Sequence, residues 1–215
     1  MTSPLRRLVR YTLGERLVHA AAAAAYVYLL LTGLAFWTPG LYWIAGVLGG
    51  GYVSRAVHPW MGLVFAAVVG AMFAMWRRDM RTTDADRAWR RAMGAYVRHD
   101  DAGVPAAGRF NYGQKQLFWL MTLGGLGLLV SGLVLWVPQA VPPSAHWLLQ
   151  AAVLVHAVSA LATIAGFIVH LYMGLAVVPG GLHAIVRGEV SETWARHHHR
   201  GWLDEQAGRD AAGDR

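Results

Sequence analysis

The sequence predicts an all-α fold, a bundle of four helices that spans a membrane. The 215 residues are 56% hydrophobic and only 14% charged, which is more apolar than an ordinary soluble domain. Asp, Glu, Lys and Arg are absent from three long runs: Leu17–Ser54, Ala56–Trp76 and Gln116–Val186. Ten Trp and eight Tyr suit a protein that is anchored at two membrane–water interfaces.

The uncharged runs hold four predicted spans. A membrane helix needs about 20 predominantly apolar residues, so the first run holds one span at 17–37, ended by "TPG", and the second holds one at 57–76. The third run is long enough for two spans, at 117–137 and 148–178, because the prolines of "VPQAVPPS" break the helix between them. The last span exceeds the bilayer thickness and is expected to tilt or protrude.

The remaining segments are polar, and the whole chain, 1–215, is expected to form one membrane domain. The loop 77–115 is rich in Arg and is predicted to hold an interfacial helix at about Asp84–Val97. The tail 188–215 ends in "AGRDAAGDR", which is predicted to be disordered. The first apolar run is longer than a signal-peptide core, so it is expected to be an uncleaved span.

The positive residues predict the orientation. Four Arg precede the first span, nine Arg or Lys lie between the second and third, and further Arg follow the fourth. The loops 38–55 and 138–147 contain only Arg55. The positive-inside rule therefore places both termini and the loop 77–115 in the cytoplasm and the two short loops outside.

Composition also excludes several functions. The formal net charge of +7 does not indicate nucleic-acid binding, because the charges lie in blocks between uncharged runs and no basic face runs through the chain. The absence of cysteine excludes disulfides, Cys zinc sites, iron–sulfur ligation and the attachment site of a c-type haem. A metal here would have to be held by His, carboxylate or Met.

Four histidines lie in or at the edges of the spans: His19, His58, His156 and His170. Ionisable residues there are costly and usually face a partner or a cavity, although each could instead hydrogen-bond to a neighbouring helix. The predicted orientation places His58 and His156 near the outer ends of their spans, and His19 and His170 toward the cytoplasmic ends. Two neutral imidazoles on one haem iron give a six-coordinate centre suited to electron transfer. The sequence therefore predicts two bis-His b haems, an outer one and an inner one.

The spacing within the fourth span supports two stacked sites. His156 and His170 are 14 residues apart, close to four helical turns, so they share a face and lie roughly 21 Å apart along the axis. Small residues nearby would let a flat macrocycle approach the backbone, although glycines are also common where membrane helices pack. The glycines at suitable positions are Gly33, Gly62 and Gly166.

Several motifs carry a family resemblance that covers nearly the whole chain. They are "ERLVHA" in the first span, "VHPWMG" in the second, "RFNYGQKQLFW" before the third, "LVHAVSALATIAGFIVHLYMG" in the fourth and "GEVSETWARHHHRGW" in the tail. In combination they resemble the cytochrome b (gamma) subunit of membrane-bound respiratory formate dehydrogenase.

The resemblance implies a multi-pass protein of the bacterial inner membrane with two haem b groups, held by His58 with His156 and by His19 with His170. Electrons would arrive from an iron–sulfur (beta) subunit on the outer side and reduce menaquinone or ubiquinone near the cytoplasmic face. Formate would be oxidised in a separate Mo- or W-containing (alpha) subunit, so this chain would transfer electrons without itself oxidising formate. The resemblance also implies that the whole complex assembles into multimers, as complexes of this family often do.

The resemblance also implies a quinone pocket, lined here by Asn111, Gly113 and Gln114. Lys115 of the same segment is a further predicted contact, and Tyr172, two residues past His170, is a weaker candidate. The alternative is that these are polar residues at a helix start. The other histidines match neither pair and are expected to have no metal role: His99, His146, His183 and His197 to His199.

Two other functions stay open. One is the same kind of cytochrome serving a nickel–iron hydrogenase or a thiosulfate or polysulfide reductase, and "VHPWMG" and "RFNYGQK" favour the formate enzyme over these. The other is a haem-free transporter, which would be expected to have a discontinuous helix or an internal repeat of its spans. The sequence shows neither feature.

Overall fold

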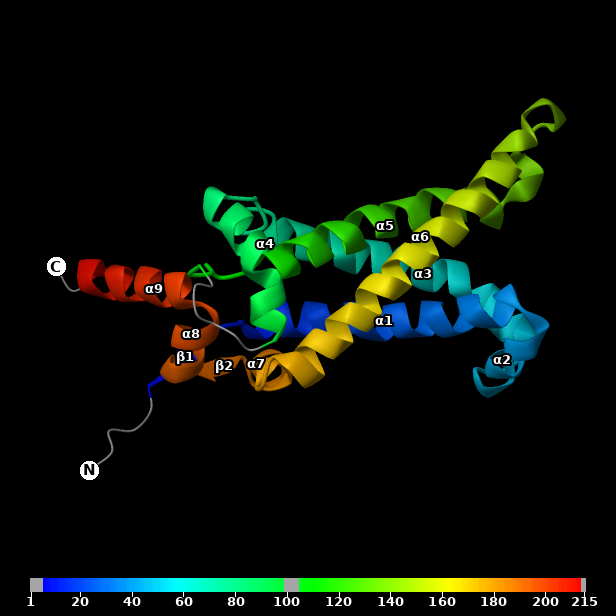
Figure 1. The fold of residues 1–215 in the computed structure, drawn as a ribbon. Helices are drawn as coiled ribbons and strands as arrows, with labels where there is room; N and C mark the ends of the chain where they lie inside the picture. The colour runs from blue at the N-terminus through cyan, green and yellow to red at the C-terminus, as the bar shows by residue number, and fades with distance from the viewer. Residues whose placement is uncertain (1–5, 99–104, 214–215) are drawn as a thin grey trace. The chain divides into compact units, whose positions relative to one another are not determined.

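Four long apolar helices run through the computed structural model, which describes residues 6–98 and 105–213 (Figure 1). They are α1 (Leu13–Trp37), α3 (Gly51–Trp76), α5 (Tyr112–Trp136) and α6 (Trp147–Tyr172). α6 continues into a short π-helix, η4 (Met173–Val177), so that this apolar run covers 31 residues. All four are long and apolar enough to cross a membrane, which confirms the four predicted helices.

Three of these helices begin a full turn or more before the predicted spans. α1 starts at Leu13 instead of 17, α3 at Gly51 instead of 57, and α5 at Tyr112 instead of 117. The prediction excluded these turns because they contain or border charged residues, which are costly inside a bilayer. α1 and α5 extend because their first turns are capped, by Thr12 in α1 and by Asn111 in α5.

Prolines and glycines shape the connections between the long helices. The short helices are η1 (Pro39–Leu41) and α2 (Trp43–Val47) before α3, and η2 (Pro138–Ala140) and η3 (Pro143–Ala145) before α6. Each 3-10 helix begins with a proline, whose fixed φ suits the first helical position. Gly49 and Gly50 have φ of 95° and 98°, a left-handed conformation that ends α2 and turns the chain into α3.

The chain folds into two compact units. Unit 1 consists of the described residues of Met1–Arg16, Trp76–Trp119 and Val169–Arg215, and unit 2 consists of Leu17–Met75 and Leu120–Ile168. Unit 2 therefore contains most of the four long helices.

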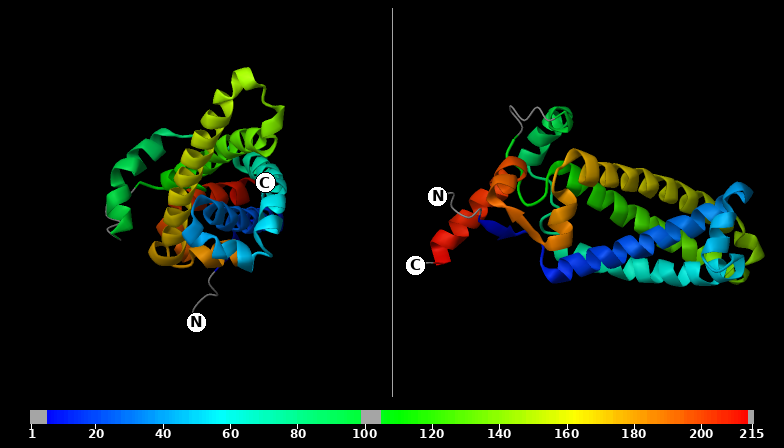
Figure 2. Two further views of the ribbon diagram at one scale, coloured as in Figure 1. Left: turned by 90° about the vertical axis from the view of Figure 1, so that its right-hand side faces the viewer. Right: turned by 90° about the horizontal axis from the view of Figure 1, so that it is seen from below.

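The core of unit 2 draws on all four of these helices. Ala25 and Tyr26 of α1 and Phe65 of α3 are buried together, with Met121 of α5 and Phe167 of α6 packed against them. The Tyr26 ring lies 5.7 Å from the Phe65 ring and 5.0 Å from the Phe167 ring. Figure 2 shows the four long helices packed together as a bundle in unit 2.

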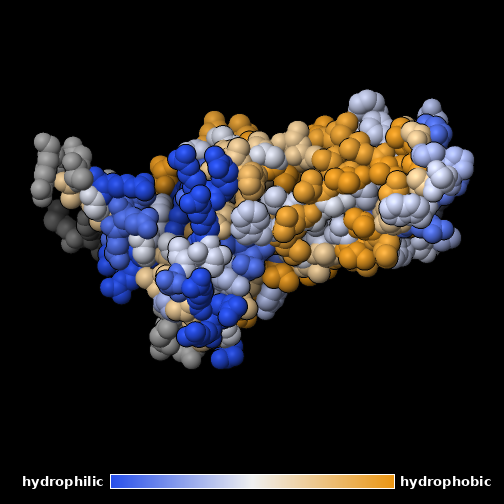
Figure 3. Space-filling model, turned by 90° about the horizontal axis from the view of Figure 1, so that it is seen from above, coloured by the Kyte–Doolittle hydropathy of each residue, from blue (hydrophilic) through white to orange (hydrophobic). Residues whose placement is uncertain are grey.

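The outer surface of unit 2 is apolar, as Figure 3 shows for one face. Large apolar side chains are exposed along α5 and α6, among them Leu123, Leu126, Val130, Leu154, Val158 and Leu161. Exposed apolar surface of this extent is stable in contact with lipid, not with water.

Unit 1 contains the short polar-rich elements. They are β1 (Arg7–Val9), α4 (Asp84–Val97), α7 (Gly181–Arg187), β2 (Glu189–Ser191), α8 (Glu192–His198) and α9 (Arg200–Gly213). β1 and β2 pair antiparallel, with Leu8 opposite Val190. Both side chains are buried together with Ala195 and Trp202, and these residues form a small core.

The structure of unit 1 tests two predictions from the sequence. The predicted helix Asp84–Val97 is confirmed with the same bounds as α4. The predicted disorder after 206 is wrong as far as Gly213, because α9 runs through it. Trp202 in the first turn of α9 is buried, and Leu203 packs against the same core, so the helix starts from an anchored turn.

Candidate functional site

The four predicted ligand histidines lie on three of the long helices. His19 is on α1, His58 on α3, and His156 on α6, all within unit 2. His170 is in the last turn of α6 and belongs to unit 1, where its side chain is exposed.

His58 is held by a hydroxyl group on the neighbouring helix. Its Nδ1 atom lies 2.6 Å from Oγ1 of Thr32 on α1, and Thr32 is fully buried. Phe36, one turn further along α1, packs edge-on against the imidazole at 5.7 Å between ring centroids. The ring of His58 is therefore fixed on two sides, and the nitrogen that bonds to the hydroxyl is Nδ1.

His156 is held in the same way. Its Nδ1 atom lies 2.9 Å from Oγ of Ser131 on α5, and Ser131 is buried. A Cβ at Gly132 would lie only 3.3 Å from Cε1 of His156, so this glycine lets the ring pack closely against α5. The helices that carry His58 and His156, α3 and α6, also share the core of unit 2. The structure thus brings these two predicted ligands into one region of unit 2.

The second predicted pair is divided between the two units. His19 lies in unit 2 and His170 in unit 1, so their pairing stays a prediction. Two of the predicted glycines leave room beside the helices of unit 2, since a Cβ at Gly33 or Gly62 meets no atom within 4 Å. Gly166 is buried in α6.

The predicted quinone segment forms the start of α5. The backbone N–H of Asn111 donates to Oε1 of Gln114, and the backbone N–H of Gln114 donates to Oδ1 of Asn111, both at 3.0 Å. This reciprocal arrangement is a capping box. Because it uses only the amide oxygens, the –NH₂ groups of both side chains stay available as donors to a ligand. Gly113 lies inside the box, where its Cβ position is 3.5 Å from Oδ1 of Asn111.

Lys115 is engaged within the protein. Its Nζ atom donates to Oδ2 of Asp86 at 2.7 Å and to the carbonyl of Arg81 at 2.9 Å, and both side chains of the ion pair are buried. Burial alone would raise the pKa of Asp86, but hydrogen bonds from Lys115 and Thr83 hold that pKa below its usual value. Lys115 therefore fastens α5 to the start of α4, and contact with a quinone would require it to leave Asp86.

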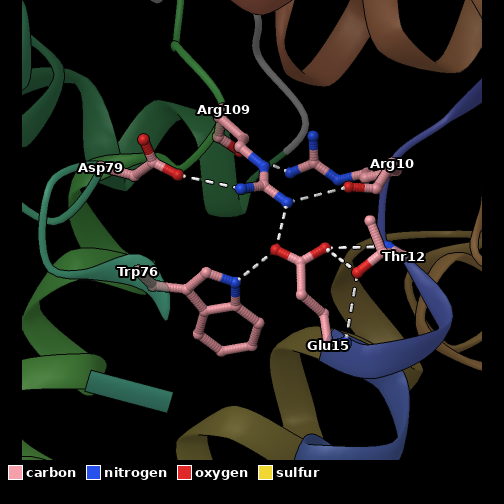
Figure 4. Close-up of polar contacts among 6 residues, drawn as sticks. All are labelled: Arg10, Thr12, Glu15, Trp76, Asp79 and Arg109. Atoms are coloured by element: carbon pink, nitrogen blue, oxygen red, sulfur yellow. Dashed lines mark hydrogen bonds and ion pairs between the residues drawn. The ribbon is translucent and has the colours of Figure 1, made fainter. Parts of the chain in front are cut away.

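A network of charged residues at the start of α1 was not anticipated from the sequence (Figure 4). The carboxylate of Glu15 accepts hydrogen bonds from Arg109 and from the indole of Trp76, both at 2.6 Å. Arg109 also donates to Asp79 at 2.9 Å and to the carbonyl of Arg10 at 3.2 Å. Arg109 thereby joins three separate segments of unit 1, two residues before Asn111.

Capping motifs in the sequence mark the two carboxylates, Glu15 and Asp86, that form buried ion pairs in unit 1. Thr12 and Glu15 form a capping box, as do Thr83 and Asp86, in the spacing T-x-x-E or T-x-x-D. The motif indicates where α1 and α4 begin. It does not indicate that each carboxylate also binds a cation far away in the sequence.

His199 has a structural role in unit 1. Nδ1 of its buried ring lies 2.8 Å from the carbonyl of Gly108, and Nε2 lies 2.9 Å from Nη2 of Arg10. A carbonyl can only accept and a guanidinium can only donate, so Nδ1 carries the proton and the ring is neutral. Burial, with the positive charge of Arg10, holds the pKa of His199 well below its usual value. The sequence analysis left His199 in the polar tail, and the predicted absence of a metal role for His99 lies outside the described residues.

The hydroxyl partners of His58 and His156 were also missed. The signal was a short repeat, "TGLAFW" at 32–37 and "SGLVLW" at 131–136, in which the hydroxyl residue precedes a Gly and stands five residues before the Trp that ends the helix. This pattern is too short to count as a repeat of whole spans.

The placement of the histidines on long apolar helices agrees with a comparison of the chain with protein families. A family model described as prokaryotic cytochrome b561 matches residues 10–188. The chain belongs to this family. Membership of a cytochrome b family implies haem b as the cofactor.

Curated relatives of this cytochrome are subunits of formate dehydrogenases. The cytochrome b556(fdo) subunit from Escherichia coli K12 is 33% identical over 199 residues, which are 92% of this chain and 92% of the relative. The cytochrome b556 subunit from Haemophilus influenzae is 30% identical, over 93% of this chain and 84% of the relative. The nitrate-inducible cytochrome b556(Fdn) subunit from E. coli K12 is 26% identical, over 94% and 93%. These matches confirm the resemblance that the motifs predicted.

The chemistry of His58 and His156 suits residues that would hold a haem iron. Each ring uses Nδ1 for a hydrogen bond to a hydroxyl, which leaves Nε2 as the nitrogen that can bind a metal. The rings lie among apolar helices, and Gly62, one turn from His58, leaves space beside α3.

Proposed function

We propose that this cytochrome b is the membrane electron-transfer subunit of a formate dehydrogenase. When bound, two b haems would supply one-electron carriers between an iron–sulfur subunit on the outer side and a quinone near the cytoplasmic side. The observation that carries the proposal is the matched fixing of His58 and His156 by buried hydroxyl groups within an apolar four-helix unit.

The chain's own residues have three tasks in this function. His58 and His156 would hold the outer haem, and His19 and His170 the inner one. The apolar side chains of unit 2 would exclude water from the electron path. Two histidines on each iron would leave no position open for oxygen, which suits electron transfer.

The quinone is proposed to bind beside the inner haem, against the start of α5. Tyr112 of α5 and Met173, three residues after His170, both pack against a buried cluster of Trp89 and Ala107 in unit 1. This shared cluster favours a location of the quinone segment near His170. The –NH₂ groups of Asn111 and Gln114 would donate to the quinone oxygens, whereas Lys115 would act through its support of α5.

The proposed orientation follows the distribution of Arg and Lys, with both termini and the 77–115 loop in the cytoplasm of a bacterium and the bundle in its inner membrane. The named relatives are formate dehydrogenase subunits, so an iron–sulfur (beta) subunit and a Mo- or W-containing (alpha) subunit are the proposed partners. Formate oxidation would take place in the latter.

The test is a reduced-minus-oxidised absorption spectrum of the purified complex, recorded first with dithionite and then with formate or hydrogen as the reductant. The proposal predicts b-type bands with dithionite and formate, and none with hydrogen. Reduction by hydrogen alone would assign the subunit to a hydrogenase. A dithionite spectrum without b-type bands would contradict the haem assignment itself.

A further inference from the structure

Two buried hydroxyl groups stand in equivalent places beside the outer pair of histidines. Thr32 lies on α1 and contacts His58 on α3, and Ser131 lies on α5 and contacts His156 on α6. In each case the hydroxyl belongs to the long helix that precedes the histidine's helix. The same short sequence, hydroxyl residue then Gly-Leu, surrounds both.

The hydrogen bonds of the hydroxyl groups decide which tautomer each ring adopts. Oγ1 of Thr32 lies 2.8 Å from the carbonyl of Tyr28, and Oγ of Ser131 lies 2.6 Å from the carbonyl of Gly127. A hydroxyl has one hydrogen, and a carbonyl can only accept, so this hydrogen points to the carbonyl. The hydroxyl oxygen must then accept from Nδ1–H of the histidine. The opposite direction would press two oxygen atoms together without a hydrogen between them.

This tautomer is the one that an iron ligand needs. With the proton on Nδ1, the lone pair of Nε2 is free to bind a metal. A ligand histidine that donates its other N–H to an acceptor is a more basic ligand, and its ring is held in one orientation. A more basic ligand stabilises the oxidised iron and so lowers its reduction potential.

We propose that Thr32 and Ser131 are positioning residues that set the tautomer and ring orientation of His58 and His156, and through them the reduction potential of the outer haem. This inference rests on the proposed ligand role of the two histidines. The repetition of one arrangement in two helix pairs supports it. Thr163, another buried threonine of unit 2, donates to the carbonyl of Ala160 in its own helix.

The test is a redox titration of each haem in the complex with Thr32→Val or Ser131→Ala. Loss of the acceptor should make the outer haem easier to reduce. We expect about a threefold to tenfold rise in its ratio of reduced to oxidised form at a fixed potential, where tenfold is about 59 mV for one electron. The inner haem should titrate as in the wild type.

Matched controls separate this role from general packing. Thr163→Val and Ser54→Ala remove other buried hydroxyl groups of the same unit. The hydroxyl of Thr163 donates to the carbonyl of Ala160, and that of Ser54 has no hydrogen-bond partner among the described residues, so both variants should leave the outer potential unchanged. Thr32→Ser and Ser131→Thr keep the acceptor and should restore the wild-type value. If Thr32→Val does not assemble, Ser131→Ala, which removes only one oxygen, carries the test.

The outcomes distinguish the inference from the proposed function. If His58→Ala keeps the outer haem, the ligand assignment is wrong. If His58→Ala loses that haem while Thr32→Val and Ser131→Ala titrate as the wild type, or shift no more than the two controls, the positioning role alone is wrong.

Discussion

Polar side chains serve different purposes in the two units. In unit 1 they are charged and join distant segments: Arg109 binds Glu15 and Asp79, and Lys115 binds Asp86. The polar contacts described around the histidines of unit 2 are neutral, between a hydroxyl and an imidazole. The contrast follows from the surroundings, because a charge inside a bilayer is far more costly than a neutral hydrogen bond. Charged groups therefore join the segments of unit 1, while neutral hydroxyl groups hold the histidines of unit 2.

The largest expected effect is loss of a haem. His19→Ala or His170→Ala should remove the inner haem and with it quinone reduction, and should leave the outer haem reducible by formate. Haem content and quinone reductase activity of the complex measure this. His146→Ala and His183→Ala, outside both pairs, should retain both haems. Loss of both haems from His19→Ala alone would indicate a failure of folding, and retention of both would contradict the assignment.

The next effect tests the charged network of unit 1. Arg109→Met leaves the carboxylate of Glu15 buried without its cation, and removal of one partner of a buried pair costs about 3–5 kcal/mol. Because 26% of the Arg109 side chain is exposed, we expect Arg109→Met to lower the free energy of unfolding by about 2–3 kcal/mol. Chemical or thermal unfolding of the complex gives the value.

An exposed ion pair is the matched control for Arg109. The pair of Arg87 with Asp84 has side chains that are 70% and 93% exposed, so Arg87→Met should change stability by less than about 0.5 kcal/mol. Equal losses of stability in the two variants would mean that burial does not strengthen the ion pairs of Arg109.

A smaller effect separates helix capping from quinone binding at Asn111. Asn111→Asp and Asn111→Ser keep an oxygen for the N–H of Gln114 but lose the –NH₂ donor. Loss of one hydrogen bond of about 0.5–1.5 kcal/mol should raise the KM for quinone about 2- to 10-fold with unchanged stability. An unchanged KM in both variants would leave Asn111 with the capping role only.

The smallest effect is a pH dependence in unit 1. Since the pKa of His199 is lower in the folded chain than its unfolded value of about 6.5, its stabilising contribution is complete above that pH and declines as the pH falls below it. Between pH 6.5 and 5.5 the loss should reach up to about 1 kcal/mol. His199→Gln should remove this part of the dependence, whereas His197→Gln, an exposed neighbour, should retain it. Identical profiles for all three proteins would contradict a buried neutral His199.

The long helices could be predicted from the sequence because a bilayer demands about 20 uncharged residues in a row. The absence of charge does not give their starting points, since caps such as Thr12 with Glu15 extend α1 into charged sequence, and the start of α1 is marked only by its T-x-x-E capping motif. Single histidines stand out in apolar runs, whereas Thr32 and Ser131 are ordinary in such helices until the neighbouring helix is known. Arg109 and Glu15 are 94 residues apart, and no local pattern links them.

The central claim is that His58 and His156 hold one haem together, and the most direct test is a redox titration of His58→Ala, His156→Ala and the double variant within the complex. The account predicts that all three lose the same b-type component and keep the other. Loss of different components from the two single variants, or an unaltered pair of components, would contradict it.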